Sequence, residues 1–75
     1  MAKLPRLTGR EMVQFLKQQG FTVVRIRGSH HFLEMHDRRT SVPVHGSRNL
    51  KIGTLRSILR DIDMTPTEFS DLLKR

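Results

Sequence analysis

Three short segments typical of β-strands follow one another in the middle of the chain, and they constrain the fold more than any other feature. Phe21 to Arg27, His30 to His36 and Thr40 to Val44 are rich in β-branched residues or alternate apolar with polar residues. Gly28-Ser29 and Asp37-Arg38 separate them and are typical of turns. The sequence therefore predicts a three-stranded antiparallel sheet, whose third strand is exposed or at an edge.

Helix signals flank these strands on both sides. Thr8 and Glu11 have the spacing of a capping box, and Gly20 is a typical helix end. Leu50 to Asp61 carries apolar residues at helical spacing, and Thr65-Pro66 predicts the start of a last short helix. Because three strands alone bury little area, both main helices should cover one face of the sheet. The predicted fold is α+β, in the order α-β-β-β-α with a short extra C-terminal helix.

Size and composition limit the class of protein. With 75 residues, residues 1–75 are expected to form a single domain with one modest core. The absence of cysteine excludes disulfides and thiolate chemistry, and no apolar run approaches the ~20 residues that span a bilayer. We therefore expect a cytoplasmic protein without a membrane partner. No motif typical of a metal site is present, and we expect neither a metal nor another cofactor.

Charge points to a polyanionic partner. The net charge is +7, and ten of the fourteen basic residues are arginine, which binds phosphate in a bidentate way. Residues 1–60 hold twelve basic and three acidic side chains, whereas residues 61–75 hold two basic and four acidic ones. A nucleic-acid partner explains this cationic body better than a surface that is charged for solubility alone.

Alternation along each strand predicts which side chains share a face. The expected inward set is apolar except for one histidine: Val24, Ile26, His31, Leu33, Met35, Val42 and Val44. The expected outward set carries the polar and basic side chains: Val23, Arg25, Arg27, His30, Phe32, Glu34, Ser41, Pro43 and His45. The two adjacent histidines are thus expected on opposite faces.

A two-residue turn at Asp37-Arg38, or a four-residue loop from His36 to Arg39, would place His30 directly opposite His45 and Leu33 opposite Val42. A three-residue loop would not. Two histidines side by side suit metal-free cleavage of RNA. One imidazole takes the proton from a ribose 2′-hydroxyl, which attacks the adjacent phosphorus, and the other donates a proton to the leaving 5′-oxygen. Arg25 and Arg27 would hold the phosphate.

A histidine beside a glycine turn is more often a hydrogen-bonding loop residue than a catalyst. The alternative is therefore a non-catalytic RNA-binding module with a basic face. In either case the expected RNA-binding set is Arg25, Arg27, Ser29, His31, Arg48 and Lys51. A small DNA-binding regulator is a third possibility, but the sequence has no helix-turn-helix signal.

Four landmarks in this order resemble the HicA-type (YcfA-like) toxin family: Gln19-Gly20-Phe21, Gly28-Ser29-His30-His31-Phe32, Val42-Pro43-Val44-His45 and Gly53-Thr54-Leu55-Arg56-Ser57-Ile58-Leu59. The resemblance implies a double-stranded-RNA-binding-domain-like fold. It also implies a metal-independent messenger-RNA interferase, an endoribonuclease that blocks translation, with a HicB-type antitoxin protein as partner.

The resemblance maps the family's catalytic histidine onto His30. Some members carry it one place later, so His31 is the runner-up, whereas a catalytic role for His45 comes from the register above and not from the family. We expect the antitoxin to be an acidic protein that covers the outward face of the sheet. The acidic segment from Asp63 to Asp71 extends beyond the shortest members and has no assigned role.

Overall fold

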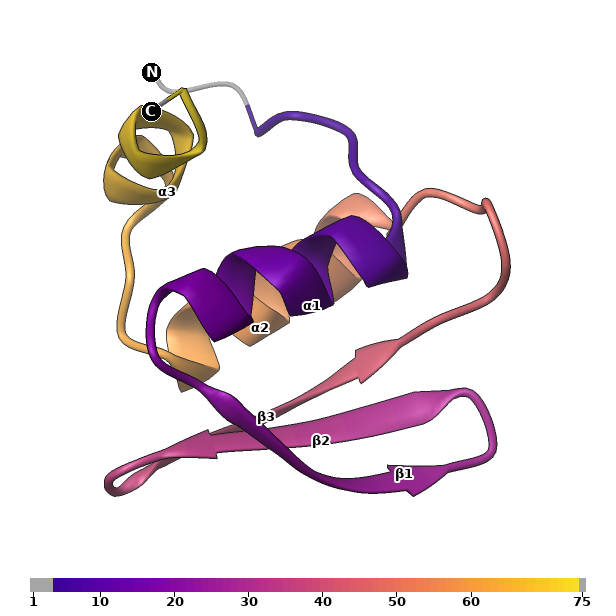
Figure 1. Cartoon of the computed structure of the whole chain (residues 1–75). Helices are drawn as coiled ribbons and strands as arrows, with labels where there is room; N and C mark the ends of the chain where they lie inside the picture. Colours follow the sequence, from indigo (N-terminus) through magenta and orange to yellow (C-terminus); the bar gives the residue numbers. More distant parts are fainter. Residues whose placement is uncertain (1–3, 75) are drawn as a thin grey trace.

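The computed structural model describes residues 4–74 and has the predicted order of elements (Figure 1). These are α1 (Gly9–Gln18), β1 (Thr22–Arg27), β2 (His30–Met35), β3 (Arg38–Pro43), α2 (Ile52–Asp61) and α3 (Pro66–Leu73). The strands form one antiparallel sheet in the order β1-β2-β3. The α+β class and the double-stranded-RNA-binding-domain-like arrangement are therefore confirmed.

The start of α1 is fixed by local hydrogen bonds and by a close approach. Thr8 Oγ1 accepts from the Glu11 amide at 3.1 Å, and Glu11 Oε1 accepts from the Thr8 amide at 2.8 Å, so the predicted capping box is present. Gly9 lies against the end of β3, where a Cβ atom would collide with the Pro43 carbonyl oxygen. The helix start and the strand end therefore hold each other in place.

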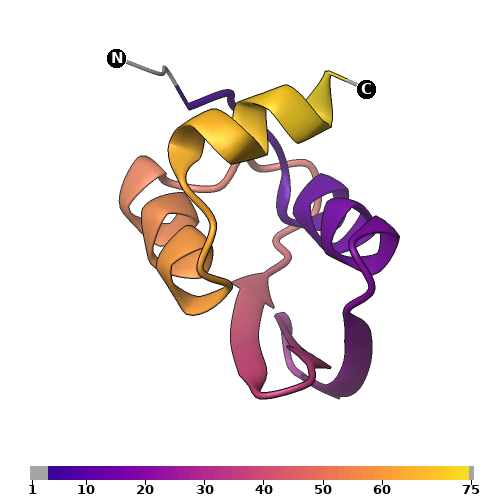
Figure 2. The same cartoon turned by 90° about the vertical axis from the view of Figure 1, so that its left-hand side faces the viewer.

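The molecule has three layers (Figure 2). α1 and α2 lie side by side on one face of the sheet, and α3 crosses them on the side away from the sheet. Leu33 and Val42 face the helices and are fully buried. Phe69 of α3 is also fully buried and meets Phe15 of α1 edge to face, with ring centroids 4.9 Å apart. The third layer is thus part of the core.

The register between β2 and β3 differs from the prediction. The turn lies at His36-Asp37, where His36 adopts a left-handed φ of 57°, and not at Asp37-Arg38. Leu33 consequently pairs with Thr40 and His30 pairs with Pro43, so the predicted pairs of Leu33 with Val42 and of His30 with His45 are wrong. The shift is two residues, and it leaves the inward and outward faces of these strands unchanged.

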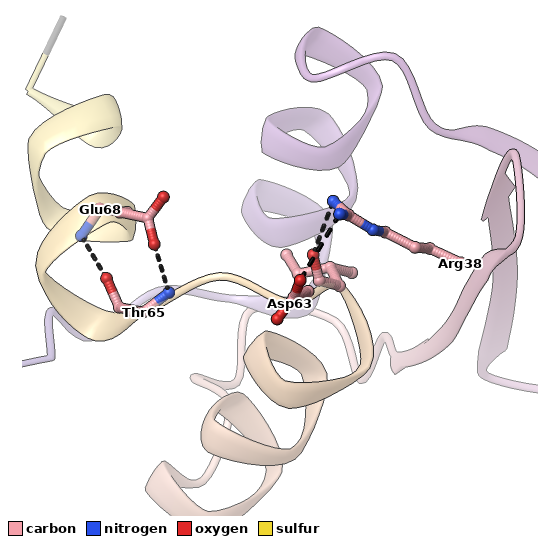
Figure 3. Close-up of polar contacts among 5 residues, drawn as sticks. Arg38, Asp63, Thr65 and Glu68 are labelled. Atoms are coloured by element: carbon pink, nitrogen blue, oxygen red, sulfur yellow. Dashed lines mark hydrogen bonds and ion pairs between the residues drawn. The ribbon is translucent and has the colours of Figure 1, made fainter.

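Long-range contacts account for this register. Arg38 begins β3, and its guanidinium donates to the Ile62 carbonyl oxygen at 3.2 Å and lies 3.6 Å from the Asp63 carboxylate (Figure 3). Thr40 is buried, and its hydroxyl donates to the Asp61 carboxylate at 3.0 Å. Both side chains therefore connect β3 to the end of α2. These contacts cannot be predicted from the residues of the turn alone.

A β-bulge in β1 overturns a second expectation. The pairing with β2 skips one residue between Val23 and Arg25, so Val24 is the extra residue and is 52% exposed. Val23 takes the inward position opposite Leu33 and packs against the core. The predictions of Val24 inward and Val23 outward are therefore wrong. Ile26 does share the helix-side face with His31, but it remains 59% exposed.

Helix α3 begins with a second capping box, between Thr65 and Glu68 (Figure 3). Pro66 occupies the first helical position, as predicted. The hydrogen bonds from the backbone and side chain of Thr65 lower the pKa of the Glu68 carboxyl below its usual value. Within residues 4–74, none of the helices has the length and apolar character needed to cross a bilayer.

Candidate nucleic-acid interface

The face of the sheet opposite the helices carries the residues that sequence analysis favours for RNA chemistry. We call it the open face and define it by Arg25, Arg27, His30, Phe32, Glu34, Arg39 and Ser41, which the strand pairing places on one side. In Figure 1 it is the side of the sheet turned away from α1 and α2. Three of these residues are arginine and one is acidic, so the open face is basic.

His30 is the first residue of β2 and is exposed on the open face. Gly28-Ser29 forms the tight turn between β1 and β2, and Gly28 has a left-handed φ of 60°. This turn pairs Arg27 with His30, and directly opposed residues have Cβ atoms about 4.5–5.5 Å apart. An imidazole and a guanidinium therefore share one end of the open face.

The next row along the sheet pairs Arg25 with Phe32 and Phe32 with Ser41. The guanidinium carbon of Arg25 lies 4.8 Å from the centre of the Phe32 ring, which is a cation–π contact. One row farther, Arg39 forms an ion pair with Glu34 at 3.7 Å. Arg25 and Arg27 thus both lie outward, as predicted, but Arg27 pairs with His30 and Arg25 pairs with Phe32.

His45 does not pair with His30. Strand β3 ends at Pro43, and one further hydrogen bond runs from the Val44 amide to the Ser29 carbonyl oxygen at 2.7 Å. His45 follows in the exposed loop before α2, two residues beyond the partner of His30. The juxtaposition that made His45 the second catalytic group is therefore absent, although both residues lie near the Gly28-Ser29 turn.

His31 faces the helices, as its strand position predicts. It lines a groove between α1 and β1, and its Nδ1 atom is buried without a hydrogen-bond partner among residues 4–74. Apolar and polar side chains line this groove in equal number: Val13, Val23, Ile26 and Val44, and Arg10, Gln14, Lys17 and His31. A ligand on the open face would thus meet His30, whereas one in the groove would meet His31.

Lys51 directly precedes α2, and Arg48 lies in the exposed loop before it. With Pro43 and His45 they line a pocket at this end of the molecule (Figure 1). Lys51 is the N-cap residue, and its side chain makes no capping hydrogen bond. Figure 1 shows the loop before α2 and the β1–β2 turn at the same end of the molecule. The predicted RNA-binding residues are therefore divided between the open face, the Ser29 turn, the groove and this pocket.

Two features of these sites were not predicted from the sequence. Arg10, Gln14 and Lys17 form the helix side of the groove, and their spacing of four and three residues could have shown that they share a helix face. Phe32 was placed outward but given no role, although an aromatic residue among polar and charged side chains could have drawn attention to it. No cluster of three potential metal-ligating side chains occurs in the described part of the chain.

Comparison with known proteins identifies a family. The model of the family described as the HicA toxin of bacterial toxin–antitoxin systems matches residues 9–64. The match begins at α1, includes the whole sheet and α2, and stops before α3. A search of curated proteins found no match.

Proposed function

We propose that this chain, which belongs to the HicA toxin family, is the toxin of a toxin–antitoxin pair that cleaves messenger RNA without a metal ion. The proposal takes the toxin class from the family match. The observation that carries the ribonuclease mechanism is the pairing of His30 with Arg27 on the basic open face. Histidine supplies proton transfer near neutral pH, and arginine binds phosphate, so the pair combines the two requirements of the reaction.

In the proposed reaction, His30 removes the proton from a ribose 2′-hydroxyl. The 2′-oxygen attacks the adjacent phosphorus, the bond to the 5′-oxygen breaks, and the 5′-oxygen takes up a proton. The products are a 2′,3′-cyclic phosphate and a 5′-hydroxyl end. Arg27 stabilises the negative charge that develops on the phosphate oxygens. DNA has no 2′-hydroxyl, so this mechanism selects RNA.

His45 is the proposed donor of the proton to the leaving oxygen. Its support is the position in the loop beside the Gly28-Ser29 turn, and no longer a direct pairing with His30. Because that loop is exposed, a water molecule can replace the imidazole in part. We therefore expect His45→Ala to slow cleavage less than His30→Ala, and an equal or larger effect would make His45 the principal residue.

The test of the enzyme compares variants on a long RNA in the presence of EDTA. The unchanged protein should cleave the RNA, and His30→Ala should abolish cleavage while still binding the RNA. His36→Asn is a matched control, because His36 lies at the other end of β2 in a turn with positive φ that asparagine tolerates. Cleavage that survives in His30→Ala but is lost in His31→Gln would move the site to the groove.

The second candidate is a non-catalytic RNA-binding module, which the basic open face also supports. It would bind RNA with strong salt dependence and leave the RNA intact. If none of the proteins cleaves RNA and all retain salt-sensitive binding, the module is correct and the toxin acts by occupancy alone.

The proposed partner is a HicB-type antitoxin with an acidic surface that covers the open face in the cytoplasm. Opposite charges favour this contact, because the open face bears three arginines. The complex should protect His30 and stop RNA cleavage. A complex that leaves His30 exposed and cleavage unimpeded would refute this mode of neutralisation.

A further inference from the structure

The four phenylalanines of the chain fall into two environments. Phe15, Phe21 and Phe69 are buried in the core between the sheet and the helices. Phe32 is half-buried on the open face and does not pack against that core. The core uses the other three phenylalanines. Packing of the core therefore does not explain why a large apolar ring lies on the basic open face.

Phe32 has a guanidinium and a hydroxyl as its cross-strand neighbours on the open face. The guanidinium of Arg25 lies over its ring at 4.8 Å, and Ser41 is opposite it on β3. Phe32 is two residues from His30 on the same face of β2, or about 7 Å along the strand. Single-stranded RNA is recognised mainly by stacking its bases on aromatic rings and on guanidinium planes.

We propose that the Arg25–Phe32 pair is a base-stacking subsite for single-stranded RNA, adjacent to the nucleotide whose 2′-hydroxyl faces His30. This inference rests on the proposed function and adds the class of substrate, because a base inside a duplex is not available to stack on the pair. Ser41 can hydrogen-bond the edge of the stacked base. The subsite fixes the position of the chain so that the 2′-hydroxyl of the neighbouring nucleotide lies at His30.

A purely structural role for the pair makes a different prediction. Cross-strand contacts between arginine and phenylalanine also stabilise sheets, and their loss would lower stability without any dependence on nucleobases. The test must therefore measure stacking itself, with an RNA that the protein cannot cleave. A single-stranded 2′-O-methyl oligonucleotide meets this need, because it lacks the free hydroxyl that attacks the phosphorus.

The chain contains neither tryptophan nor tyrosine, so Phe32→Trp creates its single strong fluorophore. The 2′-O-methyl oligonucleotide should quench this tryptophan, and neither a duplex nor an oligonucleotide without bases should do so. Leu73→Trp is the matched control, because Leu73 is partly exposed at the end of α3, in the layer farthest from the sheet. Its fluorescence should not change on binding.

Affinity gives a second readout. Phe32→Ala and Phe32→Leu should each weaken binding of the oligonucleotide about 5- to 150-fold, the range for loss of one stacked base. Phe32→Tyr keeps an aromatic ring and should bind the oligonucleotide as tightly as the unchanged protein does. Circular dichroism spectra that match the unchanged protein would show that each variant is folded.

The subsite is overturned by saturating oligonucleotide that leaves the Phe32→Trp emission unchanged, or by equal affinity for oligonucleotides with and without bases. Failure of the unchanged protein to bind the single strand would also overturn it. None of these results depends on cleavage, so the subsite and the histidine mechanism can fail separately.

Discussion

Replacing Phe69 with alanine should destabilise the whole protein, although Phe69 lies beyond the residues that the family model matches. The ring is fully buried and meets Phe15 edge to face at 4.9 Å. Core substitutions of phenylalanine by alanine cost about 3–5 kcal/mol, because they lose buried apolar area and leave a cavity. A chain of this size has a total free energy of unfolding of about 4–11 kcal/mol. The variant should therefore lose about a quarter of its stability or more.

Urea unfolding followed by circular dichroism at 222 nm measures this loss, since the chain has no tryptophan to report by fluorescence. The midpoint of thermal unfolding should fall by at least about 12 °C. Thr67→Ala is the matched control: Thr67 is exposed on the same helix, and its replacement should change stability by about 0.5 kcal/mol or less.

A loss of less than about 1 kcal/mol in Phe69→Ala would refute the reasoning. It would mean that α1 and α2 pack stably without α3, and that α3 is an appendage. The proposed function would be untouched, because α3 contributes no residue to the open face.

Other predictions concern the start of α1, the bulge in β1 and the capping box of α3. Gly9→Ala should destabilise by about 1–3 kcal/mol in urea unfolding despite alanine's better helix propensity, because its Cβ collides with the Pro43 carbonyl oxygen. Val23→Ala should cost more stability than Val24→Ala, which should be nearly neutral; the reverse order would place the bulge elsewhere. Hydrogen bonds lower the pKa of Glu68 in the folded protein. The contribution of Glu68 to stability is therefore complete above its unfolded pKa and is lost as the pH falls through its folded pKa. Unfolding midpoints measured at about pH 5 and pH 3 should differ less in Glu68→Gln than in the unchanged protein.

Elements whose signals are local could be predicted from sequence. Both capping boxes join residues only three apart, and their hydrogen bonds form as Thr8 with Glu11 and Thr65 with Glu68. The faces of β2 and β3 were also predictable, because alternation with period two needs no partner. His30 and His31 consequently lie on opposite faces, as expected.

Register depends on distant residues, and here the prediction failed. No glycine or asparagine marks the β2–β3 turn, so no local signal distinguished a turn at His36-Asp37 from one at Asp37-Arg38. Arg38 instead joins β3, where it contacts Ile62 and Asp63, 24 and 25 positions along the chain. The bulge at Val24 was equally hidden, because two adjacent valines fit the inward position equally well.

The error in register changes the chemistry more than the fold. A shift by two residues keeps every side chain of β2 and β3 on its expected face, but it replaces His45 by Pro43 as the neighbour of His30. The groups that remain beside His30 are Arg27 across the strand pair and Phe32 along the strand. One binds phosphate and the other stacks bases, so the open face favours a mechanism in which His30 alone is the principal proton-transfer residue and the RNA is positioned by contacts on either side of it.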